Sequence, residues 1–241
     1  MTFDERISSL EQENFRLKSF MELQNLFSAH MYYLRAQKQA EEFEALWSKS
    51  PDIAYCHNGD AYIGPENVKA YYVAFSHAKN ERRLQKYKKT YPKMVFKNTD
   101  LGMGNLTARL LTTPYIVVAG DGKTAKGLWF SPDVTVEADG DGTLVARGSL
   151  AKFGVDFIYE DGAWKLWHVA SYGEFGFGVD EKIVDGYKYI ARPDGRGIPE
   201  PGPEPQKKLP RTPFSATSPC DFFPPLPVPY ESWDNSLSFV Q

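Results

Sequence analysis

Turn sequences alternating with runs of β-branched and aromatic residues dominate the middle of this chain, residues 106–172. Gly-Asp-Gly-Lys and Glu-Asp-Gly separate such runs, and these turns are typical of β-hairpins because the favoured hairpin turns need positive φ. The stretch therefore predicts an antiparallel sheet of four or five strands. The clearest predicted strands cover residues 115–119, 124–131, 144–159 and 164–171. A sheet of this length needs an apolar cover on one face.

Helical patterns upstream of the sheet supply that cover. In residues 21–47, apolar side chains recur every three or four residues and share one face with His30 and Tyr33. We expect a break in this helix near residues 36–40. We also expect it to end before Pro51, since proline disfavours the helical conformation in the residue before it.

Two further segments are predicted to be helical. Residues 4–18 are charged, and this helix either leads into the next one or packs against a neighbouring subunit. Its narrow stripe consists of Ile7, Leu10, Asn14 and Leu17. Residues 67–79 follow Pro65, which suits the first turn of a helix. The basic segment 80–98 has no clear pattern, and we expect a mobile helix-and-loop region there.

Composition excludes several classes of protein. The net charge of −3 and the lack of a basic stripe argue against nucleic-acid binding. No run of eighteen apolar residues or signal peptide is present, so no membrane association is expected. Cys56 and Cys220 lie far apart and outside any metal-ligand spacing, which predicts free thiols and a cytoplasmic location. No motif indicates a metal or a cofactor, and none is expected.

The composition changes after about residue 192. Residues 193–241 hold twelve of the seventeen prolines, so we expect an extended arm that cannot add a strand ladder. The arm is nevertheless rich in large apolar residues, which favours docking over a solvated tail. These residues are Phe222, Phe223, Leu226, Tyr230, Trp233 and Phe239. We predict that the arm (193–241) packs on the outer face of the sheet of the main domain (1–192), in the same chain or across a homo-oligomer. The alternative is a loose tail for another partner.

The order of elements resembles that of the nuclear transport factor 2-like superfamily, and in particular its SnoaL-like branch. The segments that carry the resemblance are residues 26–47, 65–72, 112–132 and 155–169, within a region of about 15–175. The resemblance implies an α+β fold in which a curved antiparallel sheet wraps around the helices as a cone-shaped barrel with a deep pocket. It also implies a small-molecule substrate and association as a dimer or trimer. The same fold hosts dehydratases, isomerases, lyases and binding modules.

The dehydratase-like members of this branch use a tyrosine, an aspartate and a histidine around the pocket. The resemblance matches the tyrosine to Tyr32 or Tyr33 and an acid to Asp133. An aspartate is absent shortly after the tyrosine, and a histidine is absent before residue 112. Either the chemistry differs from that of the dehydratases, or other groups have taken over.

The chain's own residues suggest such groups. His30 and Tyr33 lie one helical turn apart on the apolar face, where a histidine is either a packed core residue or a base at the pocket. His168 ends an apolar strand, and Asp156 lies in the preceding strand of the same hairpin. If both point inward, Asp156 can orient His168 as a general base; otherwise Asp156 faces solvent on the outer side.

The remaining candidates would bind substrate. Tyr55 and His57 share one face of a short strand, either at the pocket mouth or on the exposed side of a hairpin. Tyr72 and Trp129 would shape the pocket, together with Asp133. The sequence thus predicts a cofactor-independent lyase, such as a dehydratase, or an isomerase that acts on a small, mostly apolar, aromatic or polycyclic substrate. The proposed catalytic residues are His168, His30, Asp156 and Tyr33. The alternative is a binding module without turnover.

Overall fold

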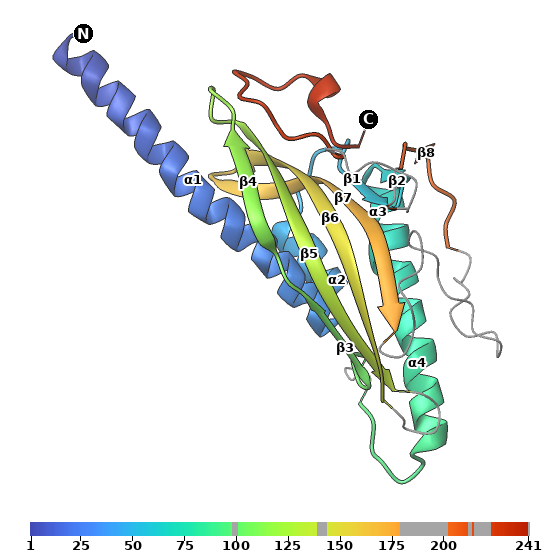
Figure 1. The fold of residues 1–241 in the computed structure, drawn as a ribbon. Helices are drawn as coiled ribbons and strands as arrows, with labels where there is room; N and C mark the ends of the chain where they lie inside the picture. The colour runs from blue at the N-terminus through green and yellow to red at the C-terminus, as the bar shows by residue number, and fades with distance from the viewer. Residues whose placement is uncertain (98–100, 139–143, 179–201, 212–213, 215–222, 241) are drawn as a thin grey trace.

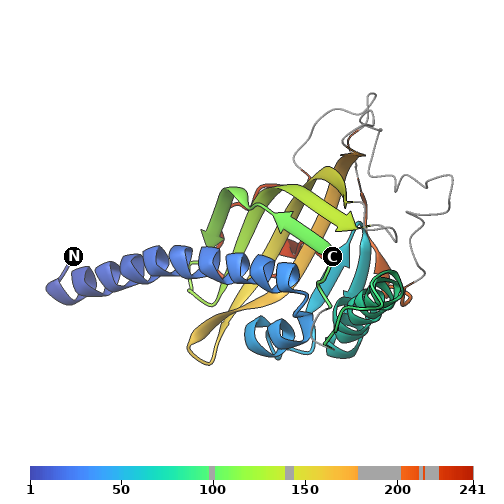
Figure 2. The ribbon, with the colours of Figure 1, turned by 90° about the horizontal axis from the view of Figure 1, so that it is seen from below.

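The fold is an open, curved sheet packed on helices, in a computed structural model that describes residues 1–97, 101–138, 144–178, 202–211, 214 and 223–240 (Figure 1). The helical segments α1, α2 and α4 lie on one side of the sheet (Figure 2). We call this side the inner face and the opposite side the outer face. The curved antiparallel sheet predicted from the sequence is confirmed, and it stays open along its path of strands.

The helical layer comes from the first part of the chain. Its segments are α1 (Phe3–Ala36), α2 (Gln39–Leu46), α3 (Pro65–Val68), the π-helix η1 (Lys69–Phe75) and α4 (Ser76–Thr90). The predicted break is confirmed, since Gln37 adopts a left-handed conformation with φ of 59° between α1 and α2. Nothing in the described parts of the chain is a helix long and apolar enough to span a membrane.

The sheet is built mainly from long hairpin strands. They are β1 (Ala54–His57), β2 (Asp60–Ile63), β3 (Asn105–Arg109), β4 (Thr112–Val118), β5 (Thr124–Ala138), β6 (Leu144–Glu160), β7 (Ala163–Gly178) and β8 (Lys207–Lys208). The strand order is β3-β5-β6-β7-β1-β2-β8, and β4 also pairs with β5. All pairs are antiparallel except β1 with β7, which run parallel.

Two expectations from the sequence are confirmed and one was wrong. Residues 4–18 and 21–36 form one continuous helix, α1, so the charged helix leads into the next one. The basic segment is a helix followed by a loop, since α4 buries Leu84 and Tyr87 and ends at Thr90. The C-terminal arm does add to the sheet, because Lys207–Lys208 contains no proline and pairs with Asp60 and Ala61 of β2.

The core lies between α1 and the inner face of β5 and β6. Phe27 of α1 packs on Trp129 and Phe153, with ring centroids 4.6 and 5.4 Å apart. Val155 and Phe157 follow Phe153 on this face, because alternate residues of a strand point to the same side. Lys126, Gly154 and Asp156 therefore point to the outer face.

The C-terminal segment 223–240 lies across one end of the outer face, beside the turn between β4 and β5 (Figure 1). Its backbone pairs with the turn between β4 and β5, where the N–H groups of Gly120 and Asp121 donate to the carbonyls of Tyr230 and Glu231 at 2.9 and 2.8 Å. Farther along, Phe239 packs against Gly154 and is 8% exposed. The tail's aromatic residues thus dock in the same chain, on the face expected from the sequence.

A charged cluster fixes this tail to the sheet. Asp156 is 0% exposed and lies 2.6 Å from Lys126 Nζ and 3.0 Å from His168 Nδ1. The tail contributes the hydroxyl of Ser238 at 3.1 Å and the backbone N–H of Phe239 at 3.0 Å to the same carboxylate. We call Lys126, Asp156, His168 and Ser238 the tail clamp.

Candidate functional site

A buried group of polar side chains lies on the inner face where α1, α2 and η1 meet. His30 of α1 places Nδ1 at 2.5 Å from Glu42 Oε1, and both side chains are fully buried. The indole N–H of Trp47 donates to the same oxygen at 3.1 Å, and the hydroxyl of Tyr72 donates to the other, Oε2. We call these four residues the His30 cluster. A charged carboxylate needs such a full set of donors in order to be buried.

The two nitrogens of the His30 ring have different surroundings. Nδ1 lies against the Glu42 carboxylate, and when it donates to that carboxylate, Nε2 of a neutral ring carries the lone pair. That Nε2 atom is buried and has no partner among the described residues. Burial and the charge of Glu42 hold the pKa of Tyr72 well above its usual range, so its hydroxyl stays a donor. Nε2 is therefore the ring atom of His30 that no described residue engages.

Aromatic rings surround this basic nitrogen. Phe27 stacks on the His30 ring at 5.3 Å, and Tyr72 lies at 5.9 Å from it. Tyr55 of β1 lies 4.9 Å from Tyr72, and burial raises its pKa to about 12, so its hydroxyl stays protonated. The surroundings of His30 are therefore apolar, with tyrosine hydroxyls at their edge.

A second polar group lies farther along the inner face. Arg109 of β3 lies opposite Asp133 of β5, with Nε at 3.8 Å from Oδ2, and its guanidinium is 5.7 Å from the Phe153 ring. Asp133 also accepts a 2.5 Å hydrogen bond from Ser131. Burial raises the pKa of Asp133, and the Arg109 charge opposes this effect. The Arg109 charge also acts on Tyr55 and Tyr72, which links this group to the His30 cluster.

His57 next to this group is neutral. The N–H of Gly173 donates to Asn58 Oδ1 at 2.8 Å, so the amide nitrogen of Asn58 faces His57 Nε2 at 3.2 Å and donates to it. Burial and the nearby charges of Arg109 and Arg211 lower the pKa of His57 to about 4. His57 can therefore donate through Nδ1 but is a poor base at neutral pH.

The structure divides the residues proposed from the sequence between the two faces. The inner face holds His30, Tyr55, His57, Tyr72, Trp129 and Asp133. Tyr33 interacts with Lys38 at the C-terminal end of α1 rather than with the cluster. Asp156 and His168 are paired but lie on the outer face, under the tail. The expectation that they share a pocket with His30 was wrong, and so was the alternative that Asp156 faces solvent.

An irregularity in β7 explains this error. The register of β6 and β7 shifts between Asp156 and Phe157, which pair with His168 and Leu166, so Trp167 is an extra residue on β7. The bulge places Leu166 and Val169 on the inner face and turns His168 to the outer one. Strict alternation along the strand, which the sequence suggests, had put Leu166 and His168 on the same face.

Sequence inspection also missed Glu42, Arg109 and Lys126. Glu42 is one of several carboxylates in QAEEFEAL, and nothing in that run distinguishes it. The only local feature that sets Glu42 apart is its position beside Phe43, on the helical turn that leads to Trp47. Of the thiols, Cys56 is free and buried, whereas Cys220 lies outside the described residues, as does Phe222.

A surface groove of about 410 Å³ runs between α2 and η1, near the His30 cluster. Its lining includes Phe43, whose ring stacks on Trp47 at 5.8 Å. Trp47 in turn donates to Glu42, so Phe43 contacts both the groove and a member of the His30 cluster. No three or more His, Cys, Asp or Glu side chains within the described ranges form a group that could hold a metal ion.

A model of the SnoaL-like domain family matches residues 16–170. Hexachlorocyclohexane dehydrochlorinase LinA-type3 from Novosphingobium barchaimii LL02 is 14% identical, with 70% of this chain and 94% of that chain covered and a TM-score of 0.47. A putative scytalone dehydratase from Novosphingobium aromaticivorans is 11% identical, with 72% and 95% covered and a TM-score of 0.48. No curated protein matches the chain. Structural likeness at this level supports no conclusion about activity.

Proposed function

This chain belongs to the SnoaL-like domain family, and from that premise we propose that it is a cytoplasmic, cofactor-independent lyase or isomerase in which His30 is the general base. The observation that carries the proposal is the buried His30 Nε2, which has no partner in the described residues while Nδ1 is held by Glu42. A basic nitrogen placed in an aromatic enclosure suits removal of a proton from carbon or oxygen.

Each neighbouring residue has a role in this proposal. Glu42 orients the His30 ring and stabilises the imidazolium that forms when Nε2 takes the proton. The hydroxyl of Tyr55 donates a hydrogen bond to the oxyanion that develops on an enolate or phenolate. The positive charge of Arg109 stabilises the same oxyanion from a greater distance. Trp129 and Tyr72 form the walls.

The proposed reaction is an elimination or a proton shift. His30 removes a proton, and the electrons of that bond form a double bond as a leaving group such as hydroxide departs from the adjacent carbon. In an isomerase, the protonated His30 returns the proton to another carbon. The enclosure favours a small aromatic or polycyclic substrate.

A ring-opening reaction that needs only a base tests the role of His30. 5-Nitrobenzisoxazole opens when one carbon-bound proton is removed, and its product is coloured. We expect the protein to open it faster than the same concentration of free imidazole does. His30→Asn should lower the rate by about 10²-fold or more.

His77→Asn is the matched control, because His77 also lies near a glutamate, with Nδ1 at 3.7 Å from Glu81, but its side chain is 52% exposed. This variant should keep the full rate. An unchanged rate in His30→Asn, or a rate for the unaltered protein no higher than that of imidazole, would contradict the proposal.

The second candidate is a binding module without turnover. One observation favours it: Asp156 and His168 serve the tail on the outer face, so they add no acid–base group to the inner one. Native mass spectrometry of the purified protein distinguishes the two. A binding module retains its ligand unchanged in both the unaltered protein and His30→Asn, and neither form accelerates the ring opening.

A further inference from the structure

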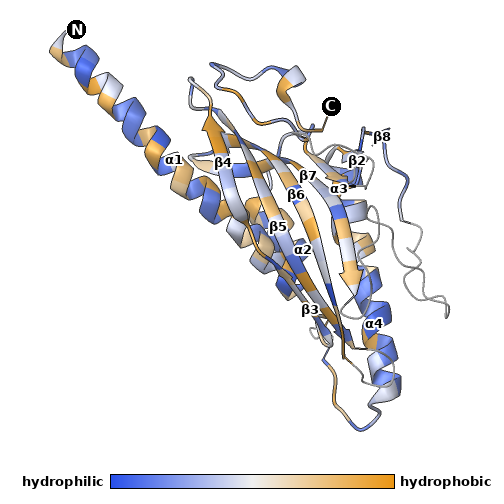
Figure 3. Ribbon diagram, viewed as in Figure 1, coloured by the Kyte–Doolittle hydropathy of each residue, from blue (hydrophilic) through white to orange (hydrophobic). Residues whose placement is uncertain are grey.

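The N-terminal half of α1 projects beyond the sheet as a free helix (Figures 1 and 3). A capping box at Thr2 and Glu5 fixes its first turn, and from Phe15 onward one face of the helix packs against the rest of the chain. Large apolar side chains on the free part face solvent. Their exposed fractions are 76% for Phe3, 41% for Ile7, 59% for Leu10, 71% for Leu17 and 62% for Met21.

The spacing of these residues is a heptad repeat. Steps of four and three residues lead from Phe3 to Met21 through position 14. In heptad terms, Ile7, Asn14 and Met21 occupy a, and Phe3, Leu10 and Leu17 occupy d. An a/d stripe with this period is the seam of a left-handed coiled coil. A β-branched residue at a with leucine at d favours two strands.

Asn14 interrupts the stripe at an a position. A polar side chain there has no place in an apolar seam unless it meets its own equivalent, which occurs when two copies run parallel and in register. The two Asn14 side chains then hydrogen-bond to one another. The seam therefore selects a second copy of this chain over an unrelated apolar partner.

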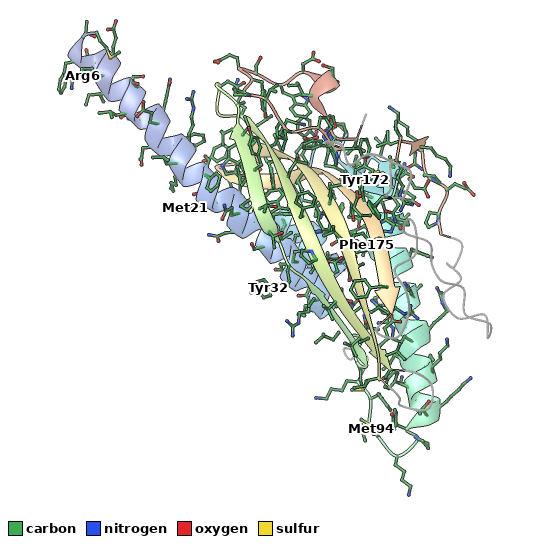
Figure 4. The ribbon with its side chains drawn as sticks, in the orientation of Figure 1. Arg6, Met21, Tyr32, Met94, Tyr172 and Phe175 are labelled. Carbon is green, nitrogen blue, oxygen red and sulfur yellow. The ribbon has the colours of Figure 1, made fainter. Side chains whose placement is uncertain are left out.

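The charges that flank the stripe agree with this arrangement. In a parallel pair, position g of one helix faces position e of the next heptad on the other. Arg6 at g then faces Glu11 at e, and Glu13 at g faces Lys18 at e. Both pairs are of opposite charge, and all four side chains are exposed, so they are available to a partner (Arg6 and Met21 are labelled in Figure 4).

The same helix leaves room for two protein bodies. In residues 3–23 its contacts with the rest of its own chain come from Phe15, Arg16, Ser19 and Leu23, which occupy b, c, f and c. These positions lie on the outside of a two-stranded coil. The stripe therefore faces away from the sheet. In the dimer, the sheet of each copy lies on the side of its own helix that is remote from the partner helix. Because α1 is already formed on the sheet, pairing does not bear the cost of helix nucleation.

We propose that residues 3–21 of α1 form a parallel two-stranded coiled coil with the same residues of a second copy, over a length of about 27 Å. The inference is independent of the proposed enzymatic function, because the His30 cluster lies farther along α1 and on its sheet-facing side. The pairing makes the protein a dimer joined at its N-terminal helices, with both sheets on the same end of the coil.

The mass of the full-length chain in solution tests the proposal. Light scattering over a range of concentrations should give about twice the 27.3 kDa of one chain at the higher concentrations. The double variant Leu10→Lys with Leu17→Lys should give a single-chain mass throughout. Its melting temperature at low protein concentration should be unchanged, because both side chains are exposed in one copy.

Two matched variants make the test specific. Ser8→Lys with Gln12→Lys adds the same charge at b and f and should leave the dimer intact. Glu13→Lys opposes Lys18 of the second copy and should weaken dimerisation severalfold, and adding Lys18→Glu should restore it. Since Lys18 also pairs with Glu22 of its own helix at 3.6 Å, the restored variant is compared with Lys18→Glu alone.

Several outcomes would overturn the proposal. A single-chain mass for the unaltered protein at every concentration would do so, including the case in which the protein instead sediments with phosphatidylcholine vesicles and the stripe binds lipid. A dimer that survives Leu10→Lys with Leu17→Lys would place the interface elsewhere. If Glu13→Lys combined with Lys18→Glu does not restore dimerisation, the parallel arrangement is excluded.

Discussion

The role of a single residue in this fold depends on the side of the sheet on which its side chain lies. His30 and His168 both pair with a carboxylate through Nδ1, at 2.5 and 3.0 Å, yet they lie on opposite faces and have different surroundings. His30 retains a buried, unpartnered Nε2 within the described structure, whereas His168 shares its Nδ1 with Ser238 of the tail at 3.1 Å. The same pair of residue types therefore suits proton transfer on one face and attachment of the tail on the other.

His57 gives a pH dependence that can be measured. Burial and the charges of Arg109 and Arg211 lower its pKa from 6.5 to about 4 in the folded state. Between these values the unfolded chain binds a proton that the folded chain does not, so the contribution of His57 to stability is present above pH 6.5 and is lost as the pH falls to about 4. We expect His57→Gln to flatten the fall of the melting temperature between pH 7 and pH 4.

His77→Gln replaces an exposed histidine and serves as the control. Its melting curve should follow that of the unaltered protein across this range. A His57→Gln profile parallel to that of the unaltered protein would show that His57 does not carry the effect.

The strands, taken as elements, explain how the tail is held. On β6, Phe153, Val155 and Phe157 build the core, and Gly154 and Asp156 between them receive the tail. Burial alone raises the pKa of Asp156, but the hydrogen bond from His168 and the charge of Lys126 outweigh it, and the pKa lies below its usual range. The Lys126 ammonium also lies 3.6 Å from the Phe239 ring centroid. Strand β6 thus packs against the helices with one face and binds the tail with the other.

Gly154 leaves room for the ring of Phe239 because it has no side chain. This close contact gives a second prediction. A Cβ at Gly154 would lie 2.9 Å from Cγ of Phe239, closer than side chains pack. We expect Gly154→Val to displace this ring and to lower the free energy of unfolding by about 1–3 kcal/mol.

Measuring the effect of Gly154→Val on stability in a second variant of the protein isolates this contact. In Phe239→Ala the added methyl groups meet no ring, so Gly154→Val should cost much less there than in the unaltered protein. Equal costs in the two backgrounds would place the damage elsewhere, for example in the loss of strand geometry.

The whole molecule is a curved sheet with helices on its inner face and the tail across one end of its outer face. The tail brings Phe239 and Val240 to 8% and 5% exposure and completes the partners of Asp156. Deletion of residues 223–241 should therefore lower the free energy of unfolding by about 3–5 kcal/mol, since it uncovers large apolar groups and leaves a buried carboxylate with fewer donors. Chemical denaturation of the two forms measures this difference.

The deletion also separates the tail from dimer formation. The tail docks in its own chain, and the proposed interface is on α1, so the truncated protein should keep the oligomeric state of the full-length form at equal concentration. If the free energy of unfolding is unchanged by the deletion, the tail does not stabilise the fold. If the truncated protein no longer forms the dimer, the tail also acts between copies.

Local patterns predicted most of this fold, because the hairpin turns and the apolar face of α1 are local features. The sheet, the break after Ala36 and the placement of His30 on the packed face all followed from the sequence. Contacts between distant segments could not be predicted in this way. Glu42 resembles its neighbouring carboxylates until η1 brings Tyr72 to it, and Lys126 becomes the partner of Asp156 only when β5 pairs with β6.

The face of His168 depended on a feature without a sequence signature of its own. A single extra residue on β7, Trp167, reverses the side to which the following side chains point. The apolar run around it is compatible with either face. The sequence therefore predicted the strand and the Asp156–His168 pair but not the side of the sheet on which the pair lies.

The position of the tail clamp in the chain has a consequence during synthesis. Lys126, Asp156 and His168 leave the ribosome before Ser238 and Phe239, which follow the end of β7 by about 60 residues. At about 5–20 residues per second, the part of the outer face that the tail contacts waits for it for about 3 to 12 s. During that interval the Asp156 carboxylate lacks the donors that Ser238 and Phe239 supply.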